Sequence, residues 1–125
     1  MLHLNNNKLK KIPDSVGNLQ LLQTLNLSHN SLKDLPETLS NLTRLKTFDI
    51  THNPKLKKLP KSLAHCHAIE KLLVIEGNGV QYPSNDVCQK GTTAIMQFLS
   101  KGKNVNHTLK MLRYIMQRKP NTKSK

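Results

Sequence analysis

The chain is 125 residues long, which is the size of one domain. Aromatic residues make up 3% of it and tryptophan is absent, so few side chains are present to stack on nucleic-acid bases. The net charge is +13, of which residues 101–125 supply +8 from eight basic and no acidic side chains. No apolar run approaches membrane-spanning length, and we expect a cytoplasmic protein without a secretory signal.

Residues 1–21 contain the first of several similar units, and this unit lacks its beginning because Met1 falls where a strand starts. Terminal units of a stacked repeat normally need a polar outer cover, and none is visible here. We therefore expect a fragment of a longer solenoid or a truncated product. The apolar residues predicted to form the core of this unit are Leu2, Leu4, Leu9, Ile12, Val16 and Leu19.

Residues 22–45 contain the clearest unit. Leu25 and Leu27 alternate with the polar Asn26, which is typical of a strand. After Asn30 the apolar residues recur every three or four positions, which indicates a helical or irregular segment that returns to the start of the next unit.

The same pattern recurs with a period of 23 residues, and residues 46–69 form the third unit. Such a period indicates a repeat protein, in which no unit buries its apolar face alone and stacked units share a continuous core. Equivalent strand residues are Leu4, Leu27 and Ile50, and equivalent turn residues are Asn7, Asn30 and Asn53.

Residues 70–100 are predicted to hold the last strand and a cap. Leu72 and Val74 match the strand positions, and Gly77 takes the asparagine position. Ser84 is a typical helix start, and the apolar spacing after it predicts one capping helix. Gly91 lies inside this pattern and is expected to let the helix approach the preceding unit closely.

The recurring pattern L-x-L-x-x-N-x-L-x-x-[LI]-P resembles the leucine-rich repeat, over residues 2–69 and in weaker form over 70–100. The resemblance implies an α/β solenoid, a short right-handed arc with parallel strands on its concave face. It also implies that Asn7, Asn30 and Asn53 form a structural ladder, because an amide side chain both donates and accepts hydrogen bonds. The predicted domain spans residues 1–100, with units at about 1–21, 22–45, 46–69 and 70–100.

The segment Tyr82–Leu99 reads Y-P-x-x-x-V-C-x-x-G-T-x-A-I-x-x-F-L and adds a second resemblance. It is similar to the end of the repeat domain in RING E3 ubiquitin ligases that join leucine-rich repeats to a sterile-alpha motif. In that family the repeats recognise the substrate and the RING recruits the catalytic partner. The chain has no C-x-x-C pairs, so the resemblance implies recognition without ligase activity.

Side chains between the core leucines are predicted to face a protein partner on the concave side. Most are short polar groups that form hydrogen bonds, and two are apolar residues that either lie under the C-terminal helix or anchor the partner. We predict no enzyme activity, cofactor, metal site or small-molecule substrate. The predicted partner-binding residues are His3, Asn5, Asn26, Ser28, His29, Asp49, Thr51, His52, Leu73 and Ile75.

Basic residues suggest a different hypothesis, namely attachment to an anionic membrane or to nucleic acid. Residues 101–125 are predicted to form a basic helix followed by a disordered tail. Lysines also recur just after the asparagine turns and are predicted to line one edge of the solenoid, although most charged rows are solvated faces. These rows contain Lys8, Lys10, Lys11, Lys33, Lys55, Lys57 and Lys58.

Overall fold

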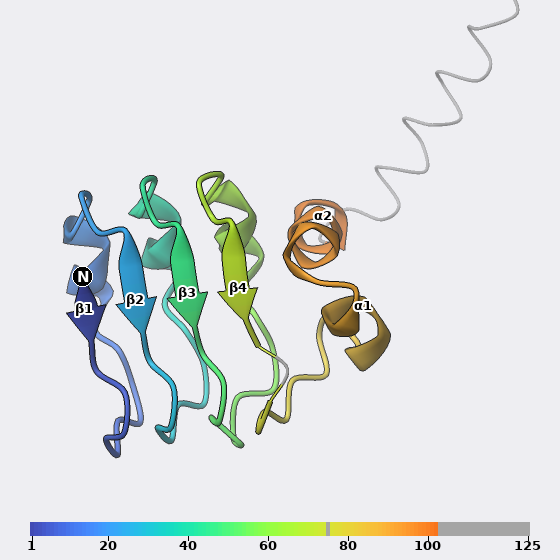
Figure 1. Cartoon of the computed structure of the whole chain (residues 1–125), viewed down its shortest axis with the longest axis horizontal. Coiled ribbons are helices and arrows are strands. Elements are labelled where there is room, and N and C mark those ends of the chain that lie inside the picture. Colours follow the sequence, from blue (N-terminus) through green and yellow to red (C-terminus); the bar gives the residue numbers. More distant parts are fainter. Residues whose placement is uncertain (75, 103–125) are drawn as a thin grey trace, which may run out of the picture.

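A computed structural model describes residues 1–74 and 76–102 of the chain (Figure 1). Its repeated units, or coils, each contribute one short strand to a parallel sheet in chain order. This confirms the predicted α/β solenoid with parallel strands and a C-terminal helical cap. The strands are β1 (Leu2–His3), β2 (Thr24–Asn26), β3 (Thr47–Asp49) and β4 (Lys71–Leu73).

Equivalent side chains lie in straight rows across the sheet because every strand pairs with the next in the same register. Leu25 pairs with Leu2 on one side and with Phe48 on the other, and Phe48 pairs with Leu72. Leu25 and Phe48 are fully buried, so this row points into the core. Since side chains alternate along a strand, the residues on either side of this row point to the outer surface of the sheet.

Short 3-10 helices return the chain from one strand to the next. They are η1 (Asp14–Asn18), η2 (Glu37–Asn41) and η3 (Lys61–His65). Each follows a proline, with φ of −68° at Pro13, −71° at Pro36 and −69° at Pro60. Proline fixes φ near these values and lacks an N–H group, so it suits a position where the extended backbone turns into a helix.

Leucine side chains fill the interior between the strands and the 3-10 helices. Leu27, Leu42 and Cys66 have no exposed surface. Leu19 was predicted to be a core residue, and this prediction is wrong, because its side chain is 44% exposed. It occupies the same position as Leu42 and Cys66, but in the described part of the chain its coil is packed on one side only.

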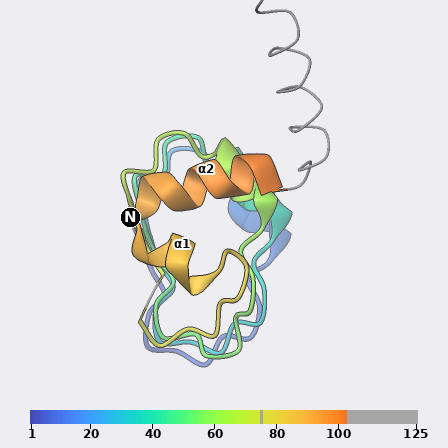
Figure 2. The same ribbon diagram turned by 90° about the vertical axis from the view of Figure 1, so that its right-hand side faces the viewer.

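Two helices, rather than the single predicted one, cover the last coil: α1 (Asn85–Gln89) and α2 (Thr92–Gly102). Gly91 separates them with a φ of +101°, which ends α1 and redirects the chain. No atom lies within 4 Å of where a Cβ on Gly91 would be, so the expected close approach at this glycine is also wrong. Viewed along the solenoid, α1 and α2 lie across the end of the stacked coils (Figure 2).

Side chains of α2 complete the core at this end. Ile95 and Leu99 are each 1% exposed, and the ring of Phe98 packs edge-on against Tyr82 with centroids 5.1 Å apart. The hydroxyl of Thr92 accepts a 3.0 Å hydrogen bond from the backbone N–H of Leu72 in β4. None of the described helices is long and apolar enough to cross a bilayer. The basic helix and tail were predicted at residues 101–125; Lys101 and Gly102 belong to α2, and residues 103–125 lie outside the described residues.

Candidate partner-binding face

The outer surface of the sheet, called the strand face, brings several predicted partner residues together. The strand pairing aligns His3, Asn26, Asp49 and Leu73 in one row. Thr24, Thr47 and Lys71 form the adjacent row.

Local hydrogen bonds hold two of these side chains in place. The Oδ1 atom of Asn26 accepts from the N–H of Ser28 at 3.0 Å and from its hydroxyl at 2.8 Å. In the next coil, Oδ1 of Asp49 accepts from the N–H of Thr51 at 3.0 Å and from its hydroxyl at 2.7 Å. Ser28 is 6% exposed, because its hydroxyl bonds to the neighbouring Asn26 side chain, so little of its surface is open to a partner.

Only one polar atom of each side chain is used in this way. Among the described residues, no hydrogen bond reaches Nδ2 of Asn26 or Oδ2 of Asp49. Asn26 therefore offers a donor to a partner and Asp49 offers an acceptor, on neighbouring strands about 4.8 Å apart. Both atoms are held at fixed positions before any partner arrives.

His29 and His52 lie beyond the strand ends in the left-handed backbone conformation, each with a φ of +57°. Their imidazole rings stack with centroids 4.0 Å apart and planes 7° from parallel. Stacked rings do not aim their nitrogen atoms at a shared point, so the two residues do not form a pair of metal ligands. Nδ1 of His52 is buried and has no partner among the described residues.

Asparagine side chains tie the coils together behind these histidines. Nδ2 of Asn53 lies 3.0 Å from the carbonyl of Leu27 in the preceding coil and 3.1 Å from that of Ile50 in its own coil. Its Oδ1 accepts from the N–H of Leu32 at 3.2 Å. Asn30 makes equivalent contacts with the first coil, whereas the exposed Asn7 bonds only to carbonyls of its own coil.

The last coil contains one extra residue between its strand and its turn. The N–H of His52 donates to the carbonyl of Glu76 at 2.7 Å, just as that of His29 donates to Thr51 at 3.0 Å. Gly77 has a φ of +69° and so matches His52, and Asn78 takes the asparagine position, with its amide bonded to Val74 and Asn53. The assignment of Gly77 to the asparagine position is therefore wrong by one residue.

The shift also changes the row that contains Asn5, Ser28 and Thr51. Glu76, not Ile75, takes the equivalent place in the last coil, and its side chain is exposed. Ile75 itself lies outside the described residues. Leu73 is 36% exposed, so the C-terminal helices leave part of this apolar side chain open to a partner.

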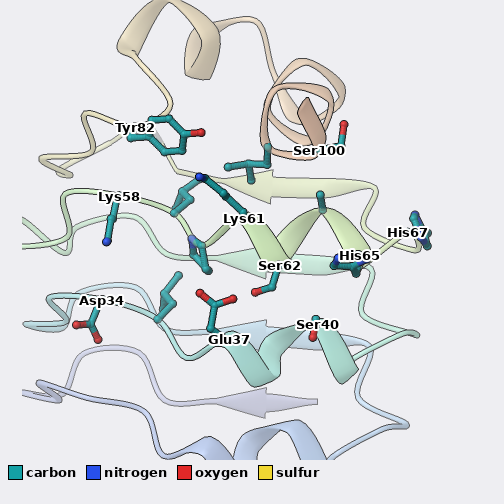
Figure 3. A pocket seen from close by; sticks show the side chains of 15 residues that line it. Asp34, Glu37, Ser40, Lys58, Lys61, Ser62, His65, His67, Tyr82 and Ser100 are labelled. Atoms are coloured by element: carbon teal, nitrogen blue, oxygen red, sulfur yellow. The ribbon is translucent and has the colours of Figure 1, made fainter. Parts of the chain in front are cut away.

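A groove that the sequence did not predict lies among η2, η3 and the end of α2, with the strands behind it (Figure 3). It has a volume of about 1040 Å³. Glu37 lines it on η2 and Lys61 on η3, and Nζ of Lys61 lies 5.9 Å from the ring centre of Tyr82. Tyr82 and Ser62 line the groove, and their hydroxyl oxygens are buried without a partner among the described residues. No sequence motif joins these residues, since they come from different coils.

The described residues contain no group of three or more His, Cys, Asp or Glu side chains able to hold a metal ion. Cys66, which the sequence places between two histidines, is fully buried and donates its thiol to the carbonyl of Leu39 at 3.0 Å. Burial raises the pKa of this thiol to about 11. The thiol therefore stays protonated near neutral pH, which suits a core residue and not a nucleophile.

Comparison with known protein families gives a match over most of the chain. A family model described as a leucine-rich repeat region matches residues 1–90. A search of curated proteins finds no match.

Proposed function

Because the chain belongs to the leucine-rich repeat family, we propose that it is a recognition module that binds a protein partner on its strand face. Leucine-rich repeat regions generally mediate protein–protein interaction and are typically not enzymes. Solenoids of this kind use the extended surface that their stacked repeats create. On the strand face of this chain, the side chains that would contact the partner include Asn26 and Asp49.

The observation that carries the proposal is the fixed pair formed by Asn26 and Asp49. Each side chain is held by its own turn and keeps one polar atom directed away from that turn. A binding surface that is ordered in advance loses little side-chain entropy when a partner docks. The pair presents a donor beside an acceptor, which matches the carbonyl and N–H of a peptide group or a carboxamide.

Two residues of the last coil extend this surface. Leu73 provides a partly exposed apolar contact beside Asp49, and Glu76, in the place equivalent to Thr51, adds a second carboxylate three residues after Leu73. Apolar contacts next to fixed polar groups are common at the energetic centre of protein interfaces. The partner segment that fits is therefore polar opposite β2 and β3 and apolar opposite β4.

The test uses substitutions that keep the turns and change only the atoms that face the partner. Asn26→Asp and Asp49→Asn both retain Oδ1, so the hydrogen bonds from Ser28 and Thr51 remain. The double variant exchanges the outward donor and acceptor. Asn18→Asp is the matched control, because Asn18 is exposed at the end of η1, away from the strands.

The full chain and both variants are used as baits, and captured proteins are compared by quantitative mass spectrometry. A partner captured by the original chain and by Asn18→Asp, and weakened about tenfold or more by the double variant, supports the strand face. Thermal melting of the three baits checks that all are folded. Equal capture by all three baits contradicts the proposal.

A role as the recognition arm of an E3 ubiquitin ligase stays a narrower prediction within the same function. It is supported by the motif in the segment Tyr82–Leu99, which contributes Tyr82 and Phe98 to the packing of the cap. The measurement that decides it is the sequence of the full-length transcript. A reading frame that continues into a RING finger supports the ligase role, and one without it removes that role.

A further inference from the structure

One edge of the solenoid, where the chain turns after each strand, carries most of the exposed lysines. In Figure 1 all strands point toward this edge, so the turns of successive coils lie side by side there. We call it the lysine edge. Its residues are 8–11, 31–34 and 55–58, and its lysines are Lys8, Lys10, Lys11, Lys33, Lys55, Lys57 and Lys58, all of them exposed.

The charge of the described residues is concentrated on this edge. The lysine edge contains seven lysines and one acidic residue, Asp34, which gives +6. The rest of the described residues contain six basic and six acidic side chains, so they are neutral when histidines are uncharged. The described part of the molecule is therefore strongly polarised, with its whole net charge on the turns at one edge.

Hydrogen bonds between coils keep these turns aligned. The N–H of Ser31 donates to the carbonyl of Leu9 at 2.8 Å, which links the first two turns. The N–H of Leu32 donates to Oδ1 of Asn53 at 3.2 Å, which links the second turn to the third coil. The backbones of successive turns therefore run side by side at about the separation of paired strands, about 4.8 Å, and carry the lysines on neighbouring turns. Their like charges are held close together by the fold.

The residue types on the lysine edge indicate which kind of anionic partner it can bind. The edge has no arginine to grip phosphates in a bidentate way and no aromatic side chain to stack on bases. The charged residues lie on turns at the margin of the molecule. Such a margin can lie against a flat surface more easily than it can surround a nucleic-acid strand. Clusters of four to eight basic residues are typical of binding to anionic lipid. We propose that the lysine edge docks on an anionic lipid bilayer, independently of the strand face.

The experiment measures binding of the full chain to phosphatidylcholine vesicles with and without about 30 mol% phosphatidylserine. The variant Lys10→Gln/Lys33→Gln/Lys55→Gln removes one edge charge from each of three coils. The matched control Lys46→Gln/Lys71→Gln/Lys90→Gln removes three exposed charges elsewhere. Residues 103–125 are unchanged in both, so their seven basic residues contribute equally.

We expect the edge variant to bind the anionic vesicles about 100-fold more weakly than the original chain, and the control variant about tenfold more tightly than the edge variant. Binding of the original chain should also fall steeply as salt rises from about 0.1 M to about 1 M. Equal vesicle binding by the two variants overturns the proposal. So does an edge variant that loses affinity for duplex DNA but keeps its affinity for the vesicles.

Discussion

The imidazole ring of His52 fills the space that a side chain on Gly77 would need. A Cβ on Gly77 would lie 2.5 Å from Cδ2 of that ring and 2.8 Å from the Cα of His52. On its other side the ring stacks on His29. His29, His52 and Gly77 thus occupy equivalent positions with positive φ in the second, third and last coils. The two rings stack on each other, and the ring of His52 lies against Gly77.

Gly77→Ala is expected to lower the free energy of unfolding by about 2–4 kcal/mol, because the added methyl meets His52 and the residue has a positive φ. Gly91→Ala is the matched control, since Gly91 also has a positive φ but has open space around it. Its cost should be about 1 kcal/mol, from backbone strain alone. Urea unfolding measures both. An equal loss of unfolding free energy in the two variants would show that the contact with His52 adds no steric cost.

Asn53→Ala is expected to lower the free energy of unfolding by about 3 kcal/mol. The substitution leaves the N–H of Leu32 and the carbonyl of Ile50 without this buried partner, and the carbonyl of Leu27 keeps only its bond from Asn30. Asn7→Ala removes the equivalent side chain from the first coil, where it is exposed, and should cost less than about 1 kcal/mol. Chemical denaturation of the two variants checks this, and similar midpoints would contradict the role given to burial.

Thr92→Val should destabilise the chain by about 1–2 kcal/mol, because the N–H of Leu72 loses the hydroxyl that satisfies it. The valine keeps the shape of the threonine, so packing changes little. Thr93→Val is the control, since its side chain is exposed on the next residue of the same helix. Hydrogen exchange at the Leu72 amide should speed up in the first variant only. Unchanged exchange there would rule out this role for Thr92.

Cys66 should resist alkylation by iodoacetamide at pH 8 in the folded chain and react readily once the chain is unfolded in urea. Burial raises the pKa of its thiol from 9.0 to about 11, and burial raises the pKa of Cys88 as well. The folded state keeps protons that the unfolded chain releases above pH 9.0. The stability that this contributes is complete below pH 9.0 and is lost as the pH rises toward about 11. Peptide mapping by mass spectrometry distinguishes the two cysteines, and rapid native labelling of Cys66 would contradict its burial.

The repeat period made most of the fold predictable from sequence. Leucines 23 residues apart have to share a core, so the pairing of Leu2, Leu25 and Phe48 follows from spacing alone. The segment around Gly77 was not predictable in the same way, because one inserted residue shifts the turn without changing the leucine spacing of the strand. At Gly91 the apolar pattern continues on both sides, and only the backbone shows that the chain turns there.

The alignment of the outward-facing row was predictable from the sequence, but its hydrogen bonds were not. Spacing identified the row His3, Asn26, Asp49 and Leu73, since alternate residues of a strand face outward. It did not show that Ser28 and Thr51 turn back to bond with Asn26 and Asp49, because such turns depend on backbone angles after the strand. The groove beside Lys61 was missed because its lining comes from different coils and α2.

Thr92, the first residue of α2, accepts a hydrogen bond from the backbone of β4, and α2 lies beside β4 at the end of the sheet (Figure 1). Across the described residues, β4 meets a helix on its outer side, whereas β1 pairs with a strand on one side only. Among the described residues, the outer edge of β1 is therefore an unpaired strand edge, the kind of edge where a further strand can add.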